Sequence, residues 1–162
     1  MKLFLRKADK SDYEELCRII KQVDFLHHRN LPNIFENNPG PARTPEYLFS
    51  IIDGEKKEII VAETDEKILG LVIIGIETSP DYSVLIPRKY VLIDNIAVDD
   101  NYRNKGVGTA LMKKVHKWAK SRNINEIVLN VYEFNDEAIE FYKKLGYRTR
   151  SRRMAVKLNK IN

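Results

Sequence analysis

The chain has almost no cysteine and no long apolar run. Its single cysteine, Cys17, cannot form a disulfide within the chain and gives no metal-ligand spacing, which is typical of a protein of the reducing cytoplasm. No apolar stretch approaches the length of a membrane span. The first ten residues, MKLFLRKADK, are charged too early to resemble a secretory signal. We therefore expect a cytoplasmic protein with no metal site and no membrane partner.

What the chain does have is apolar residues and positive charge. Hydrophobic residues make up 43% of the chain and charged residues 31%, which is typical of a globular protein, and 162 residues suit one domain. The net charge of +5 favours an anionic partner, either nucleic acid or a phosphorylated cofactor. A basic, solvated surface would produce the same composition.

The pattern of apolar and polar residues predicts one mixed α/β sheet flanked by helices. Helix starts are expected at Ser11, through a capping box that ends at Glu14, and at Thr44, which is followed by Pro45. The proline-rich stretch 27–47 is predicted to be a loop up to that second start. The other expected helices are one that follows the glycine-containing turn and runs through about Lys120, and one over residues 135–146. The expected strands are residues 3–9, 58–65, 67–79, 91–98, 126–134 and 154–158.

A phosphate-binding turn is predicted directly after the apolar strand 91–98. Gly106 and Gly108 leave the backbone bare at a helix start, while Arg103 and Lys105 add positive charge. The first N–H groups of a helix lack partners within the helix and attract anions. Neither the phosphate loop of nucleotide hydrolases nor the complete G-x-G-x-x-G fingerprint occurs in the chain.

Two segments resemble a known family. The string RNKGVG (Arg103–Gly108) is similar to the [RQ]-x-x-G-x-[GA] signature of the GCN5-related N-acetyltransferases, and LNVYEFNDEAIEFYKKLGYR (Leu129–Arg148) is similar to that family's second conserved block. The resemblance covers roughly Lys2 to Leu158. It implies a single N-acetyltransferase domain over residues 1–162 with an acyl-CoA N-acyltransferase fold: a mixed, mostly antiparallel sheet with a splayed central strand pair, flanked by helices.

The same resemblance implies acetyl-CoA as the co-substrate. Its pyrophosphate is expected on the backbone of Arg103, Asn104, Lys105, Gly106, Val107, Gly108 and Thr109. Its pantetheine arm is expected to pair with Ile96, Ala97 and Val98 and to approach Asn135. A bulge amide, that of Ile96, would polarise the thioester carbonyl. Asn135 also suits a helix N-cap, and both roles are compatible.

Tyr142 is the candidate catalytic residue, because it stands where the family often places a tyrosine acting as general acid. It also shares a helix face with Ala138 and Leu145, so a core role stays open. Asp94 is either a base or water-relay residue, or one member of an ion pair, because an unpaired aspartate within an apolar strand is costly. Asn130 departs from the glutamate of some protein N-terminal acetyltransferases and argues against that subtype.

The predicted function is direct transfer of acetyl to a primary amine. Asp24, His27 and His28 fall where the family shapes its acceptor pocket, and the acceptor is open between a polyamine, an aminoglycoside, an amino acid, a peptide N-terminus and a lysine. The alternative is a non-catalytic acyl-CoA-binding regulatory module of the same fold. Nucleic acid is disfavoured, because the basic cluster Arg148–Arg153 has few interleaved aromatic residues. A monomer or a homodimer is expected.

Overall fold

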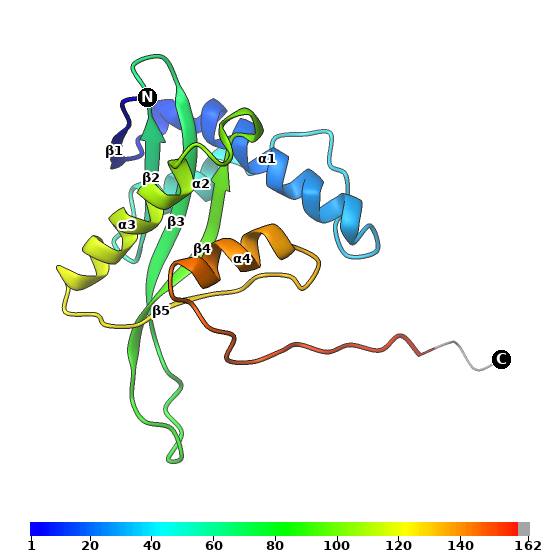
Figure 1. Cartoon of the computed structure of the whole chain (residues 1–162), viewed down its shortest axis with the longest axis vertical. Helices are drawn as coiled ribbons and strands as arrows, with labels where there is room; N and C mark the ends of the chain where they lie inside the picture. The colour runs from blue at the N-terminus through cyan, green and yellow to red at the C-terminus, as the bar shows by residue number, and fades with distance from the viewer. Residues whose placement is uncertain (159–162) are drawn as a thin grey trace. The chain divides into compact units, whose positions relative to one another are not determined.

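The computed structural model describes residues 1–158 and contains a five-stranded sheet in residues 1–130, in the order β1-β2-β3-β4-β5 (Figure 1). The first four strands pair antiparallel with their neighbours, whereas β4 and β5 pair parallel. The predicted mixed, mostly antiparallel sheet is therefore confirmed. The strands are β1 Phe4–Lys7, β2 Lys57–Glu63, β3 Ile68–Thr78, β4 Lys89–Val98 and β5 Ile127–Leu129.

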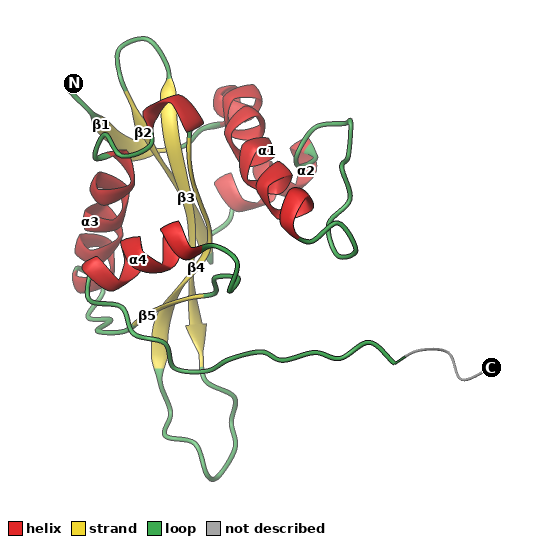
Figure 2. Ribbon diagram, turned by 45° about the vertical axis from the view of Figure 1, so that its right-hand side comes forward, coloured by secondary structure: helices red, strands yellow, loops and turns green. Residues whose placement is uncertain are grey.

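Helices cover both faces of this sheet. Figure 2 shows α1 (Tyr13–Asn30) and α2 (Pro45–Ile52) on one side and α3 (Val107–Lys120) on the other. Because both faces are covered, β2 and β3 are nearly continuous apolar runs rather than alternating ones. The core under α1 and α2 contains these buried side chains: Leu16, Ile19, Ile20, Leu48, Ile51, Ile59, Val61, Leu71 and Ile73.

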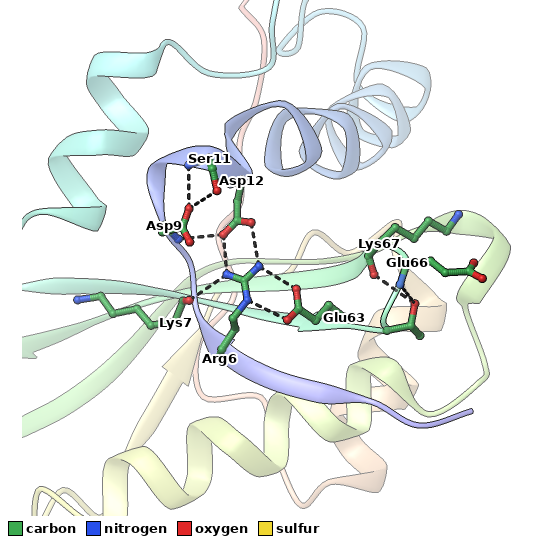
Figure 3. A network of polar contacts seen from close by, with 9 residues as sticks. Arg6, Lys7, Asp9, Ser11, Asp12, Glu63, Glu66 and Lys67 are labelled. Atoms are coloured by element: carbon green, nitrogen blue, oxygen red, sulfur yellow. Dashed lines mark hydrogen bonds and ion pairs between the residues drawn. The ribbon is translucent and has the colours of Figure 1, made fainter.

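An arginine in the first strand holds β1 to its neighbours (Figure 3). Arg6 donates to both carboxylate oxygens of Asp12, at 2.7 and 2.9 Å, and to both of Glu63, at 2.9 and 2.8 Å. Asp12 lies in the 3₁₀ turn Lys10–Asp12 that precedes α1, and Glu63 ends β2. The two bidentate contacts therefore fix a four-residue edge strand and a helix entry together.

The two predicted helix starts had different outcomes. Thr44 accepts a hydrogen bond from the amide of Tyr47 at 3.3 Å and Pro45 opens α2, as predicted. The capping box predicted from Ser11 to Glu14 is wrong, because Asp9 and Asp12 form it two residues earlier. The predicted loop also starts later than expected, because α1 continues through Asn30.

Residues 131–158 belong to a second unit, which contains α4 (Asp136–Lys144). Two strand predictions near its ends are corrected. The strand expected over 126–134 is limited to β5, and the strand expected over 154–158 is not formed: these residues are extended and exposed. A strand exists only where a neighbour supplies ladder hydrogen bonds, and an apolar alternation cannot supply that neighbour. Within residues 1–158 no helix is both long and apolar enough to cross a membrane.

Candidate functional site

The turn between β4 and α3 has the bare backbone that the sequence predicts. Asn104 and Gly106 both have left-handed backbone, with φ of 59° and 86°. Gly106 is the N-cap of α3 and offers no side chain to cap the helix. Apart from Gly106 itself and its neighbours along the chain, no heavy atom lies within 4 Å of the position that a Cβ on Gly106 would occupy, so the space beside it is open. The first amides of α3 therefore meet the conditions for binding an anion.

Three cationic side chains surround this turn. Arg103 forms an ion pair with Asp100 at 2.8 Å. The Nζ of Lys105 lies 5.0 Å from the centre of the Tyr102 ring, and the Nζ of Lys67 lies 4.7 Å from the same centre. Both distances are within the range of cation–π attraction. Arg103 and Lys105 were predicted to add charge here, whereas Lys67 was missed.

Lys67 reaches the site through the register of the sheet. It lies in the turn between β2 and β3, immediately before β3 starts at Ile68. Gly70, near that start, pairs with Val98 at the end of β4, so the β2–β3 turn and the β4–α3 turn are at the same end of the sheet. No local motif marks Lys67, and only the strand pairing could have identified it.

Helix α1 fixes the first residues of the turn. Asp99 is 1% exposed, and its carboxylate receives hydrogen bonds from Arg18 and from the amide of Asn101. Burial acts most strongly and raises the pKa of Asp99, but the two hydrogen bonds and the positive charges of Arg18 and Lys67 together outweigh it, so the pKa is lowered below its ordinary value. Gln22 accepts from the amide of Asp100 at 2.8 Å. Two side chains of α1 thus hold the turn against the end of β4.

Close packing brings the start of α3 against the sheet. A Cβ on Gly70 would lie 2.9 Å from the carbonyl oxygen of Ala97 and 3.0 Å from Val107. These separations are too short for any larger residue without displacement of the neighbours. Glycine at this position therefore allows α3 to begin directly beside β4.

The C-terminal half of β4 has an open edge in the first unit. The pairing of β4 with β5 ends at Ile93. The pairing of β4 with β3 shifts its register between Ile93 and Asn95, so Asp94 is the extra residue of a β-bulge. The amide of Asp99 donates to Leu69 of β3. Since backbone groups alternate along an antiparallel strand, Ala97 also faces β3, whereas Ile96 and Val98 face the open edge.

The expected bulge is therefore present, but it is centred on Asp94 rather than on Ile96. The side chain of Asp94 pairs with Lys57 of β2, and this hydrogen bond raises the pKa of Lys57. Gly75 of β3 lies between the two strands and has no side chain to block the contact. Of the alternatives open for Asp94, the ion pair is the one that is formed.

In the second unit, Asn135 and Tyr142 both belong to α4. Asn135 caps the helix by accepting from the amide of Ala138 at 3.2 Å. The ring of Tyr142 lies 5.4 Å from that of Phe141 and 5.9 Å from that of Tyr147, centre to centre. Burial raises the pKa of Tyr142 to about 12, so its hydroxyl is protonated at neutral pH.

The candidate acceptor residues hold the loop that follows α1. His27 stacks on Phe35 with ring centres 4.9 Å apart, and the Nδ1 of His28 lies 2.7 Å from the carbonyl oxygen of Phe35. Asp24 pairs with Arg43 at 2.7 Å. Between α1 and this loop lies a cavity of about 390 Å³, lined in part by Cys17 and Pro39–Ala42. In residues 1–158 no group of three His, Cys, Asp or Glu side chains could hold a metal ion.

A family model described as the acetyltransferase (GNAT) family matches residues 24–147, about three quarters of the chain. The chain belongs to this acetyltransferase family. An uncharacterized N-acetyltransferase of Methanocaldococcus jannaschii is 41% identical over 143 residues, which are 88% of this chain and 59% of that protein. The chain spans 32% and 59% of the lengths of the first two curated relatives that it matches.

Solved structures share the fold. A point mutant of the protein BH1408 from Bacillus halodurans superposes with a TM-score of 0.92 and 31% identity, over 96% of this chain and 99% of that one. A crystal structure of AAC(6')-Iy with a bisubstrate analogue, CoA-S-monomethyl-acetylneamine, superposes with a TM-score of 0.71 over 98% of this chain and 99% of that one. At 16% identity the latter likeness concerns the fold alone. The fold implied by the sequence motifs is thereby confirmed.

Proposed function

We propose that this protein is an acetyl-CoA-dependent N-acetyltransferase that transfers acetyl directly to a primary amine, with residues 1–162 acting as one catalytic domain in the cytoplasm. One observation carries the proposal: α3 begins, uncapped and open, at a left-handed glycine beside the open edge of β4. A helix start suits a pyrophosphate, and a strand edge suits the amides of a pantetheine arm. Coenzyme A contains both groups on one molecule.

Each part of the turn has a separate role in this binding. The backbone from Arg103 to Thr109 donates N–H groups to the phosphates, and the side chains of Arg103, Lys105 and Lys67 add positive charge around them. The backbone groups of Ile96 and Val98 pair with the pantetheine amides, because they face the open edge of β4. Ala97 faces β3 and contributes by holding these two residues in register. Asn135 caps α4 and is proposed to contact the same arm.

In the reaction, the nitrogen of the neutral amine bonds to the acetyl carbon and loses one proton to solvent, the carbon–sulfur bond breaks, and the departing sulfur takes a proton. The N–H of Ile96 is proposed to donate to the acetyl oxygen, where negative charge develops. Tyr142 is proposed to supply the proton to sulfur, since its raised pKa keeps the phenol protonated over the whole range in which amines lose their own proton. Asp94, already paired with Lys57, acts by fixing the bulge that precedes Ile96.

The acceptor class is a small-molecule or peptide amine. The acetylneamine portion of the analogue bound by AAC(6')-Iy supports an amine acceptor for this fold. The loop after α1 is held by Asp24, His27 and His28, and we assign it to the acceptor side. To identify the acceptor, a broad panel of amines is tested with acetyl-CoA, and the release of free thiol is measured for each amine.

One observation favours the non-catalytic alternative, an acyl-CoA-binding regulatory module. Tyr142 packs with Phe141 and Tyr147, and a packing role for its ring needs no proton transfer. The two functions differ in turnover: a regulatory module binds coenzyme A and releases no thiol with any amine, whereas the enzyme does both.

Titration calorimetry with coenzyme A tests the binding site directly. Gly106→Ala forces a left-handed backbone onto a residue with a Cβ, at a strain of about 1–2 kcal/mol, and moves the amides of the turn. We expect its affinity to fall at least tenfold. Gly146→Ala is the matched control, because Gly146 has a φ of 91° and the same open surroundings but lies after α4. Absence of binding heat with the unmodified protein would refute the proposal.

A further inference from the structure

The outer face of α3 is strongly basic. The chain has no carboxylate side chain from Asn101 to Asn125. In the same stretch, α3 and the turn after it carry five exposed cations: Lys113, Lys114, Lys117, Lys120 and Arg122. Within residues 1–130, none of the four lysines forms an ion pair. This face therefore attracts anions.

The dipole of the helix accounts for only part of this charge. The C-terminal end of a helix carries partial negative charge, which favours Lys117 and Lys120 in the last turn. Lys113 and Lys114 lie in the middle of α3, beyond the last turn to which this effect is limited. A surface for an anionic ligand accounts for all four lysines.

Three of the lysines form a row along the helix. Lys113, Lys117 and Lys120 are separated by four and three residues, so they lie on one face. The row extends over about 10 Å of the helix axis. Lys114 lies on the neighbouring stripe, four residues before Trp118. A row of separate positive charges suits a chain of phosphate groups better than one compact anion.

A cavity of about 320 Å³ adjoins this row. It is lined by Lys114, Lys117, Trp118, Ser121 and Arg122. The guanidinium carbon of Arg122 lies over the Trp118 ring, 3.9 Å from its centre. Within residues 1–130 the indole N–H of Trp118 has no hydrogen-bond partner, so a donor remains for a ligand that carries acceptor oxygens. The cavity combines positive charge with two planar groups.

The planar groups favour nucleic acid over an acidic peptide. Unpaired bases stack on aromatic rings and on arginine guanidinium planes, whereas the side chains of Asp and Glu have no ring to stack. The cluster Arg148–Arg153 is disfavoured as a nucleic-acid surface because few aromatic residues are interleaved with it. The face of α3 differs, since Trp118 lies among its cations.

We propose that the outer face of α3 binds single-stranded nucleic acid. The phosphates lie along Lys113, Lys117 and Lys120, and a base stacks against the pair formed by Arg122 and Trp118. A single strand is required because the bases of a duplex are stacked on one another. The site is separate from the glycine turn, since Lys117 lies about 15 Å along the axis from the first residue of α3. The proposal is therefore independent of acetyl transfer.

Tryptophan fluorescence tests this site specifically, because Trp118 is the only tryptophan of the chain. We expect oligouridylate to quench the emission of the full-length protein, with an affinity that falls as the salt concentration rises. Lys114→Gln/Lys117→Gln should weaken binding on the order of tenfold. The slope of log affinity against log salt should become shallower by about 1.4, the value for two phosphate contacts of a single strand.

Lys10→Gln/Lys21→Gln is the matched control. Lys21 lies in α1 and Lys10 in the turn before it, and α1 covers the face of the sheet opposite α3 (Figure 2). This double variant loses the same charge and should bind oligouridylate as the wild type does. Arg122→Lys keeps the charge and removes the plane, so affinity should fall about fivefold at an unchanged salt slope.

Four outcomes overturn the proposal. The first is an absence of quenching at low salt, and the second is an equal loss of affinity in the two double variants. The third is quenching by polyglutamate as strong as that by oligouridylate, which assigns the face to acidic peptides. The fourth is displacement of the oligonucleotide by saturating coenzyme A, which places it on the glycine turn instead. Calorimetry with coenzyme A on Lys114→Gln/Lys117→Gln, where unchanged affinity is expected, reports separately on the proposed function.

Discussion

Arg18 of α1 forms an ion pair with Asp99, the residue that follows the end of β4. The two residues are 81 positions apart in the chain, and the contact ties the first helix to the start of the glycine turn. Arg18 also donates to the carbonyl oxygen of Ile68 at 3.0 Å. One guanidinium therefore holds together the helix, β3 and the site.

Asp99→Asn should destabilise the protein, because it removes a charge-assisted hydrogen bond from an almost fully buried carboxylate. We expect a loss of about 1–3 kcal/mol in the free energy of unfolding, toward the lower end because Arg18 is partly solvated. Urea denaturation measures it. Glu140→Gln breaks an exposed ion pair with Lys143 and serves as control, with an unchanged midpoint expected. Equal midpoints for both variants would contradict the anchoring role of Asp99.

A second prediction concerns pH and the Arg6 cluster of Figure 3. The hydrogen bonds from Arg6, opposed by burial, lower the pKa of Asp12. A carboxylate whose pKa is lower in the folded state stabilises the fold fully above its unfolded pKa of about 4, and this stability is lost as the pH falls through the folded value. Asp12→Asn should therefore be less stable than wild type at neutral pH, and the difference should shrink in acid.

Free energies of unfolding, measured by urea denaturation from neutral pH to below about pH 4, test this dependence. Asp53→Asn is the control, since Asp53 pairs with Lys10 at 2.7 Å between side chains that are both more than half exposed. Solvent screens that pair, so its removal should change stability little at any pH. A stability difference for Asp12→Asn that stays constant down to the lowest pH would refute the argument.

The sequence predicted those parts of the fold that depend on local chemistry. Thr44 and Pro45 gave a helix start because capping needs only the next few residues. The glycine turn was predicted for the same reason, since Gly106 and the charges beside it are contiguous. Features that depend on distant pairing were missed or misplaced: Lys67 has no local signal, and the bulge at Asp94 is defined only by its register with β3.

The strand expected over 154–158 also shows that local sequence does not predict distant pairing. Alternating apolar residues predict that a segment can form a strand at the edge of a sheet, but they do not predict with which strand it pairs. Residues 154–158 carry the alternating pattern of a strand, but no strand is assigned to them. A strand forms only when two segments pair, and the sequence of one segment does not identify its partner.

Lys67 provides a test of the charge around the turn. Lys67→Met removes one of the two ammonium groups that lie over Tyr102. We expect the affinity for coenzyme A to fall about two- to fivefold, the effect of about 0.5–1 kcal/mol for a screened surface charge. Raising the salt concentration should weaken the wild type more than the variant. Lys56→Met, at the opposite end of the β2–β3 hairpin, should bind as the wild type does. Identical salt dependence in all three proteins would exclude Lys67 from the site.

Tyr142→Phe separates proton transfer from packing. The substitution keeps the ring that contacts Phe141 and Tyr147 and removes only the hydroxyl, so coenzyme A affinity and stability should stay unchanged. If the hydroxyl protonates the departing sulfur, kcat should fall about 10²–10⁴-fold at constant KM for acetyl-CoA. Because burial raises the pKa of Tyr142 to about 12, wild-type activity should show no loss from its ionisation at about pH 10 and below.

Tyr147→Phe is the matched control for this substitution. Burial also raises the pKa of Tyr147 to about 12, and the residue belongs to the same unit, so the variant loses an equivalent hydroxyl beside the same rings. Its kcat should equal that of the wild type. If Tyr142→Phe also retains full kcat, the proton comes from elsewhere and Tyr142 is a packing residue. If kcat falls in both variants and both bind coenzyme A more weakly, the effect comes from disturbed packing of the aromatic rings and not from the loss of a general acid.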